Sequence, residues 1–382
     1  MQYRTLGKTG ERVSILGFGC MRLPVIGDNP VRIDEKTASG MIHTAVDAGV
    51  NYFDTAYPYH STNFGQPGAS EPFVGKVLRE GLRDRVHLAT KLPSWLVQSR
   101  ADMDRLLEEQ LKRLQTDRID FYLVHSLNQG YWDNLLRHDL FDFLEKALAS
   151  GKIRYAGFSF HDELPLYKRI VDAWDWSFSQ IMYNYLDEDF QAGKEGMAYA
   201  SARNLGTVVM EPLRGGTLVN GLPEAARSLL TRQGSDWGPV EWALHWLWKQ
   251  PDVHVTLSGM STPEQLAQNL KLAGEVNGSV WGEEEDRLIA RVKQTILEKQ
   301  RVNCTACGYC LPCPHGVNIP RNFSLCNDFH MLQDLQARGR YHGLLTEEAR
   351  ASNCIQCGEC LEKCPQQIDI PTELLHVAEL FS

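Results

Sequence analysis

Several common sequence signals are missing from this 382-residue chain. No apolar run approaches the roughly 18 residues that a membrane-spanning helix needs, so we expect no membrane partner. Residues 1–16 are polar and broken by glycine, without the apolar stretch of a secretory signal. Lysine and arginine form no block and the formal net charge is −9, which argues against a nucleic-acid partner. We therefore expect a cytoplasmic protein.

The usual phosphate-binding loops are also missing, since neither G-x-G-x-x-G nor G-x-x-x-x-G-K-[ST] occurs. Their absence disfavours a doubly wound sheet, which is the second-ranked architecture. Short β-type runs alternate with helical stretches such as residues 101–114. The runs lie at residues 14–20, 51–54, 86–91, 119–125, 153–159, 178–183, 207–211 and 253–258. Eight strand–helix units in about 250 residues predict an α/β fold, a (β/α)8 TIM barrel.

Cysteine is abundant, and eight of the ten cysteines form two quartets near the C-terminus. The first, C-x₂-C-x₂-C-x₂-C-P, is Cys304, Cys307, Cys310 and Cys313. The second, C-x₂-C-x₂-C-x₃-C-P, is Cys354, Cys357, Cys360 and Cys364. Three thiolates at two-residue gaps can wrap one cubane cluster, and the fourth cysteine, followed by proline, ligates the other cluster. The pattern predicts two [4Fe–4S] clusters with interleaved ligands.

Zinc and disulfides are the alternative uses of these cysteines. Zinc sites use two separated C-x₂-C pairs, so a third cysteine at the same spacing would be surplus. Disulfides need an oxidising compartment, and the first 16 residues show no secretory signal, so disulfides are disfavoured. The first quartet is one residue short before Cys313, which leaves Cys326 as an alternative ligand. We expect Cys20 to be a buried, inert thiol.

A second domain is expected to follow the barrel. Residues 283–299 have apolar side chains on one helical face, and the cysteine-rich region begins at about residue 301. Further helical signals lie at residues 318–337 and 346–351. We expect the barrel to occupy residues 1–298. Residues 299–382 would form a small, mainly α-helical ferredoxin-like domain that holds the clusters.

Several spaced motifs, in order along the chain, resemble the aldo-keto reductase family. They are YRTLGKTG at 3–10, NYFDTAYPY at 51–59, TKL at 90–92, LVHS at 123–126, GKIR at 151–154 and EPLRGG at 211–216. The resemblance covers about residues 1–297, and the whole chain resembles the branch with a fused ferredoxin-type domain. It implies a small carbonyl substrate and NAD(P)H as cofactor.

The resemblance implies a catalytic tetrad at the C-terminal ends of barrel strands: Asp54, Tyr59, Lys91 and His125. Tyrosine, with a pKa near 10, is a poor acid at neutral pH, and a lysine cation beside it favours the tyrosinate. Asp54 would hold Lys91, and His125 would hydrogen-bond the substrate oxygen. Each residue taken alone could have a purely structural role. Asp54 could cap a helix and Tyr59 could pack against other aromatic rings. Lys91 could be a surface lysine and His125 a structural histidine.

The resemblance also implies where the nicotinamide cofactor binds. Ser159 and Gln180 match ligands of the carboxamide, and Met210 stands where the family has a stacking aromatic. The segment 259–269 (GMSTPEQLAQN) resembles the clamp for the adenosine phosphates, although Thr262 and Gln265 also fit a plain helix cap. The expected contacts are Ser159, Gln180, Met210, Pro212, Leu213, Gly259, Thr262, Gln265, Gln268 and Asn269.

No lysine or arginine occurs in residues 252–270. A cation would be needed to select the extra 2′-phosphate of NADPH. We therefore expect NADH to bind at least as well as NADPH, unless Lys271 or Arg214 compensates.

Three functions stay open at this point. The first is a nicotinamide-dependent carbonyl reductase whose clusters are structural, transfer electrons or dock a redox partner protein. The second is an iron–sulfur enzyme whose clusters supply or drain electrons at the barrel site, with nicotinamide secondary or absent. The third is a non-enzymatic electron carrier, which the intact tetrad disfavours. The substrate pocket would be shaped by barrel loops, including residues 58–72 and 213–235.

Overall fold

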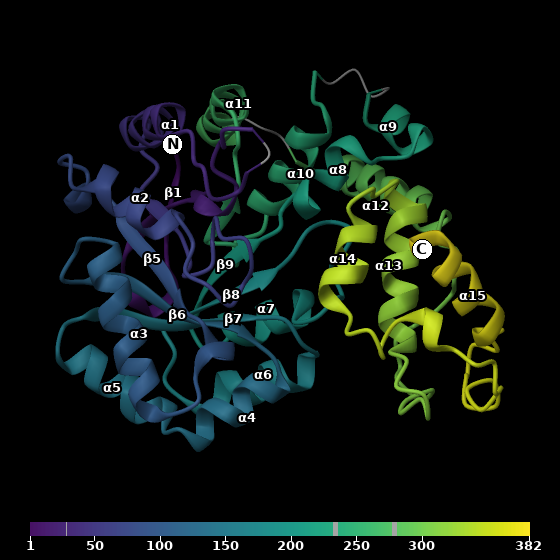
Figure 1. The fold of residues 1–382 in the computed structure, drawn as a ribbon. Coiled ribbons are helices and arrows are strands. Elements are labelled where there is room, and N and C mark those ends of the chain that lie inside the picture. The colour runs from purple at the N-terminus through teal and green to yellow at the C-terminus, as the bar shows by residue number, and fades with distance from the viewer. Residues whose placement is uncertain (28, 232–235, 277–280) are drawn as a thin grey trace. The chain divides into compact units, whose positions relative to one another are not determined.

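The computed structural model describes residues 1–27, 29–231, 236–276 and 281–382 (Figure 1). The chain forms two compact units. One comprises Met1–Pro212 and Ala243–Val280, and the other comprises Leu213–Trp242 and Trp281–Ser382. The two units are defined by which residues pack together. The predicted domain boundary at residue 298 is a different division and stays a prediction. Within the described ranges, no helix combines the length and the apolar character needed to cross a bilayer.

The first unit contains a closed barrel of eight parallel strands in the order β10-β3-β4-β5-β6-β7-β8-β9. The strands are β3 (Leu16–Gly19), β4 (Tyr52–Asp54), β5 (His87–Leu92), β6 (Ile119–Leu127), β7 (Ile153–Phe160), β8 (Phe178–Met182), β9 (Gly206–Met210) and β10 (Val255–Ser258). All eight coincide with the predicted runs to within a few residues. The TIM barrel is confirmed.

Amphipathic helices surround the strands (Figure 1). They are α1 (Glu35–Asp47), α2 (Ser70–Leu78), α3 (Arg100–Arg113), α4 (Gln129–Arg137), α5 (Leu140–Ala149), α6 (Leu164–Ala173), α7 (Gly193–Ser201) and α11 (Pro263–Glu275). α10 (Pro239–Trp248) spans the division between the units. In α3, Met103, Leu106, Leu107 and Leu111 are buried at helical spacing, as its sequence predicts.

An N-terminal hairpin, absent from the predicted elements, consists of β1 (Tyr3–Thr5) and β2 (Arg12–Ser14). Leu6 and Val13 of the hairpin are fully buried and belong to the same cluster as Tyr52, Phe121 and Phe178 of the barrel strands. The hairpin therefore supplies part of the packing inside the barrel.

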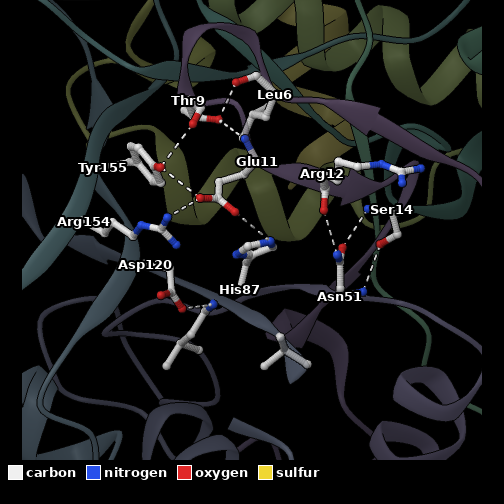
Figure 2. A network of polar contacts seen from close by, with 12 residues as sticks. Leu6, Thr9, Glu11, Arg12, Ser14, Asn51, His87, Asp120, Arg154 and Tyr155 are labelled. Carbon is white, nitrogen blue, oxygen red and sulfur yellow. Dashed lines mark hydrogen bonds and ion pairs between the residues drawn. The ribbon is translucent and has the colours of Figure 1, made fainter. Parts of the chain in front are cut away.

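Polar contacts hold the hairpin against the beginnings of the strands (Figure 2). The Tyr155 hydroxyl donates to Glu11 Oε1 at 3.0 Å, and Arg154 forms an ion pair with the same carboxylate. Ser14 N donates to Asn51 Oδ1 at 2.7 Å. Because these barrel residues lie at or before the starts of β4 and β7, the hairpin covers the N-terminal end of the barrel. The opposite end, where TIM-barrel enzymes carry their active sites, stays available.

The second unit is mainly helical, as the sequence predicts for the region after the barrel. Its helices are α8 (Thr217–Asn220), α9 (Glu224–Thr231), α12 (Glu283–Leu297), α13 (Ile319–Leu332), α14 (Ala337–Leu344) and α15 (Ile370–Phe381). Phe323 of α13, Tyr341 of α14, and Leu374 and Phe381 of α15 are buried in one apolar cluster. The cysteine loops lie before α13 and before α15.

The loop after β9 also belongs to the second unit. Arg214 Nη2 donates to Asp328 Oδ1 of α13 at 2.8 Å. Gly221 lies so close to α13 that a Cβ there would meet the Leu332 carbonyl oxygen at 1.9 Å. Of the loop 213–235 that was expected to shape the substrate pocket, residues 232–235 lie outside the described residues.

Two predicted helices need correction. The helix expected at 318–337 ends at Leu332, because Gln333 adopts a left-handed φ of 47°. The helix expected at 346–351 is wrong, since this stretch forms turns and leads into the 3₁₀ segment Ala351–Asn353. The Ala351 amide donates to Asn322 Oδ1 and the Tyr341 hydroxyl. These tertiary partners replace the carbonyl that an α-helix would offer.

Helix α15 was not predicted, although its start carries a readable signal. Asp369 caps α15 by accepting from Thr372 N, and Pro371 lies in the first turn. Asn318 caps α13 in the same way, also with a proline in the first turn. Each cap comes five residues after the last cysteine of a quartet. Quartet and helix thus form a unit that occurs twice.

Candidate functional sites

Three members of the expected tetrad are joined by hydrogen bonds at the C-terminal end of the barrel. The Lys91 ammonium on β5 donates to Asp54 Oδ1 at 2.6 Å and to the Tyr59 hydroxyl at 3.1 Å. Its third partner is the Thr55 carbonyl oxygen at 2.8 Å. Lys91 is fully buried, and Asp54 and Tyr59 are nearly so. The register of parallel strands places Asp54, the last residue of β4, beside β5.

His125 completes the group from near the end of β6. Its ring lies edge-on to Tyr59 at a centroid distance of 6.3 Å and packs on Trp95 at 5.1 Å. Buried Nδ1 has no hydrogen-bond partner among the described residues. Burial, with help from the Lys91 charge, holds the pKa of His125 well below its usual range. The imidazole is therefore neutral at neutral pH. Trp95 was not singled out from the sequence.

Burial dominates the electrostatics of the other three residues. It raises the pKa of Tyr59 above its ordinary value, while the Lys91 ammonium acts in the opposite direction. Burial also raises the pKa of Asp54, again against the pull of Lys91. For Lys91, burial works to lower the pKa, but Asp54 and Tyr59 outweigh it and the net shift is upward. At neutral pH, Lys91 is therefore charged and Tyr59 is protonated.

The two expected carboxamide ligands lie side by side. Ser159 on β7 is in register with Gln180 on β8. Gln180 Nε2 donates to the sulfur of Met210 at 3.5 Å, which fixes the orientation of the amide. Gln180 Oε1 is buried and has no partner among the described residues. An unsatisfied buried acceptor fits a ligand that brings an N–H donor, such as a carboxamide.

Some residues of the expected phosphate clamp form hydrogen bonds with one another. Thr262 Oγ1 accepts from Gln265 N at 3.3 Å, and Gln265 Oε1 accepts from Ser261 N at 2.8 Å. Asn269 is buried and donates to Ser258 Oγ at 2.8 Å. The helix-cap reading of this segment is therefore correct for Thr262. Gln265 and Gln268 are exposed on α11.

Arg22 lies beside the clamp and was missed from the sequence. A Cβ on Gly259 would meet Arg22 Cδ at 3.1 Å, and Ser261 Oγ donates to the Arg22 carbonyl oxygen at 2.8 Å. This cation is 239 residues from Ser261 along the chain. The remaining expected contacts, Pro212 and Leu213, follow β9.

Two cavities in the second unit are lined by cysteines. One is lined by Cys304, Cys307, Cys310 and Cys364. The other is lined by Cys313, Cys354, Cys357 and Cys360, with Cys310 at its edge. Each cavity thus gathers the first three cysteines of one quartet and the fourth of the other, and thiolates are the ligands that iron–sulfur clusters use. Among the described residues that line either cavity, Cys326 does not occur.

The backbone wraps around the two cavities in the same way. Ala306 and Gln356, at equivalent positions between the first two cysteines, have φ values of 55° and 60°. Gly308 and Gly358, directly after the second cysteine, have φ values of 76° and 80°. These left-handed residues turn the backbone back on itself, so that sulfurs two residues apart converge. The amide of Ala306 also donates to Cys304 Sγ at 3.4 Å.

Two family models match this chain. The aldo/keto reductase family model matches residues 15–277, and the 4Fe-4S dicluster domain model matches residues 303–368. Aldo-keto reductase YhdN of Bacillus subtilis is 30% identical over 338 residues, which cover 78% of this chain and 94% of that protein. L-glyceraldehyde 3-phosphate reductase of Escherichia coli K12 is 26% identical over 318 residues, 71% of this chain and 87% of that protein.

A solved structure is similar over about three quarters of this chain. The holo form of aldo-keto reductase AKR11C1 from Bacillus halodurans matches with a TM-score of 0.63 and 27% identity, over 76% of this chain and 96% of that one. The chain therefore belongs to the aldo/keto reductase family and is an oxidoreductase of that type with a 4Fe-4S dicluster domain.

Proposed function

We propose that the barrel reduces a small aldehyde or ketone to the alcohol with NAD(P)H. The observation that carries the proposal is the buried Lys91 ammonium, which contacts both Asp54 and the Tyr59 hydroxyl. Carbonyl reduction needs a proton donor for the oxygen, and the Tyr59 hydroxyl beside a fixed cation meets that need. Family membership supports the small carbonyl substrate.

NAD(P)H, when bound, supplies the hydride. Tyr59 then donates its proton to the carbonyl oxygen, and Lys91 stabilises the tyrosinate that remains. Burial raises the pKa of free Tyr59, so the cation 3.1 Å away is what makes proton donation feasible. Asp54 keeps the ammonium in place. A positioned acid of this kind is typically worth about 10² to 10⁴ in rate.

His125 positions the substrate. Its neutral imidazole packs against Tyr59 and Trp95, and one of its ring nitrogens is proposed to hydrogen-bond the carbonyl oxygen. A neutral ring does not compete with Tyr59 as a strong acid, so its role is to orient. The Trp95 indole packs on His125 and donates to the Phe64 carbonyl oxygen at 2.8 Å, which fixes the orientation of the indole against the histidine ring.

Gln180 and Ser159 would hold the nicotinamide carboxamide. The orphaned Gln180 Oε1 is the acceptor for its amide N–H. Ser159 Oγ already accepts from Ser126 N at 2.7 Å, and its own proton is left to donate to the carboxamide oxygen. Met210, which holds the Gln180 amide, is proposed to border the ring. Gln265, Gln268 and Arg22 are proposed to bind the phosphates.

Two [4Fe–4S] clusters are proposed to bind in the cysteine-lined cavities and to transfer electrons or dock a redox partner. A hydride carries two electrons, whereas a cubane cluster passes one at a time. Direct hydride transfer in the barrel needs no such splitting. We therefore place carbonyl reduction in the barrel and treat the clusters as a separate electron path.

A rapid-mixing experiment separates this proposal from a cluster-driven reaction. The holoprotein is mixed anaerobically with NADH or NADPH, with and without short aldehydes, while nicotinamide and cluster absorption are followed together. We expect aldehyde-dependent oxidation of the nicotinamide with oxidised clusters throughout. Bleaching of the clusters at the rate of turnover would instead favour the iron–sulfur enzyme.

A further inference from the structure

A third group of metal-binding side chains lies in the second unit, outside the two quartets. Cys326 and His330 are four residues apart on α13, so they share one helical face. His376 faces them from α15. The Cys326 sulfur and one ring nitrogen of each histidine all lie within 4.8 Å of one another.

The two histidines approach each other through their ring nitrogens. His330 Nε2 and His376 Nε2 are 3.1 Å apart, and the rings are nearly parallel at a centroid distance of 5.4 Å. Two neutral imidazoles sharing one proton would explain this pair alone. That reading leaves out Cys326, whose sulfur converges on the same point and which is completely buried.

We propose that Cys326, His330 and His376 bind one zinc ion. A thiolate and two imidazoles are ligands that zinc prefers, and three protein ligands leave a fourth position for water. Zn–N distances of about 2.0–2.1 Å and a Zn–S distance of about 2.3 Å put neighbouring donor atoms about 3.3–3.6 Å apart in a tetrahedron. The donors here already lie within 4.8 Å, with the nitrogens at 3.1 Å, so small side-chain movements suffice.

The position of this site gives it a structural role. α13 and α15 are the helices that directly follow the two cysteine quartets. A zinc ion held by Cys326 and His330 on one helix and His376 on the other would join them. Metal binding to a preformed site contributes to folding free energy. The ion would thus stabilise the framework that supports the clusters.

The first test is metal content and coordination in the intact protein. Full-length holoprotein is prepared anaerobically with zinc in the growth medium and analysed for all transition metals. We expect about one zinc per chain beside the iron of the clusters. X-ray absorption at the zinc edge should show one sulfur at about 2.3 Å and nitrogens at about 2.0–2.1 Å. Absence of zinc, another metal in its place, or zinc bound only by sulfur, as in a misloaded cluster site, would overturn the proposal.

Ligand variants provide the second test. His376→Gln and His330→Gln should each lower zinc content at least about tenfold while iron content is unchanged. His342→Gln is the matched control, because this exposed histidine on α14 lies in the same unit and contacts the Phe381 carbonyl oxygen. Zinc retained in both ligand variants, or lost equally in the control, contradicts the site. If a variant also loses iron, its zinc content is not interpretable. The X-ray absorption spectrum of the unaltered protein at the zinc edge then decides whether the ion has one sulfur and two imidazole ligands.

Discussion

The Lys91 ammonium lies 3.1 Å from the Tyr59 hydroxyl, and both groups are buried. This contact joins residues 32 positions apart in the sequence and is the geometric basis of the proposed reaction. A buried cation next to a phenol favours loss of the phenolic proton. The contact therefore makes Tyr59 the acid of the proposed reaction, and variants of the two residues test that role separately.

Tyr59→Phe should lower carbonyl reduction by about 10² to 10⁴, because it removes the proton donor and keeps the ring. Binding of nicotinamide should change little, since no contact proposed for the cofactor involves the hydroxyl. Steady-state rates and a fluorescence titration of the cofactor measure the two effects.

Tyr57→Phe is the control for that variant. Tyr57 lies two residues earlier, and its hydroxyl donates to Glu109 Oε1 at 3.2 Å, outside the tetrad. It should retain nearly full activity. Retained turnover in Tyr59→Phe would show that another group donates the proton.

Lys91→Met should destabilise the barrel by about 3–5 kcal/mol, because it leaves the Asp54 carboxylate buried without its partner. The pair is fully enclosed, with side-chain exposures of 1% and 3%, so solvent cannot compensate. Unfolding by urea, followed by tryptophan fluorescence, measures the loss.

Replacing both partners distinguishes lost charge pairing from lost packing. The double variant Asp54→Asn, Lys91→Met should recover a large part of the stability, since no uncompensated charge remains. If Lys91→Met alone were as stable as the parent protein, the Asp54–Lys91 pair would not stabilise the barrel.

Much of the fold was predictable because parallel barrel strands are buried on both faces and read as apolar runs. The N-terminal hairpin was not, because its three-residue strands contain polar residues and acquire their role only against the barrel. The membership of residues 213–231 in the second unit depends on tertiary contacts such as Arg214 with Asp328. No local pattern contains that information.

The motifs at the strand ends predict that the four tetrad residues meet, and the structure brings them together, while their catalytic role stays a proposal. Arg22 beside Gly259 was not predictable, nor was Trp95 on His125, because these contacts join distant segments. The same holds for Cys326, His330 and His376, which come from two helices. Sequence spacing reveals ligands that lie close together on one helix or loop. It does not reveal ligands on two helices that come together only in the folded protein.

Iron analysis should give about eight irons per chain, as two cubane clusters require. Cys364→Ser should lose the cluster of the Cys304 quartet and keep the other, leaving about four irons, because interleaved ligation gives each cluster one distant ligand. Cys326→Ala should keep all eight, since Cys326 lines neither cavity.

A value near four in the unaltered protein would contradict the two-cluster count. Iron lost from Cys326→Ala but retained in Cys313→Ser would show that Cys326 is the fourth ligand in place of Cys313.

NADH should bind at least as well as NADPH, because residues 252–270 carry no cation for the 2′-phosphate. Arg214 is held by Asp328 in the second unit. Arg22 is the nearby cation that can reverse the preference. Titration of both cofactors measures the ratio, and a tenfold preference for NADPH, about 1.4 kcal/mol, would overturn this prediction. Arg22→Ala then shows whether that side chain is the source.

Isotope transfer tests direct hydride transfer in the barrel. The holoprotein is supplied anaerobically with an aldehyde and with nicotinamide cofactor deuterated at the transferable position of its ring, and the alcohol is analysed by mass spectrometry. Direct transfer places one deuterium on the former carbonyl carbon, while the hydroxyl proton comes from Tyr59. Electrons routed through the clusters would take their protons from water. We predict one deuterium per alcohol molecule, and unlabelled alcohol formed with full consumption of cofactor would contradict the account.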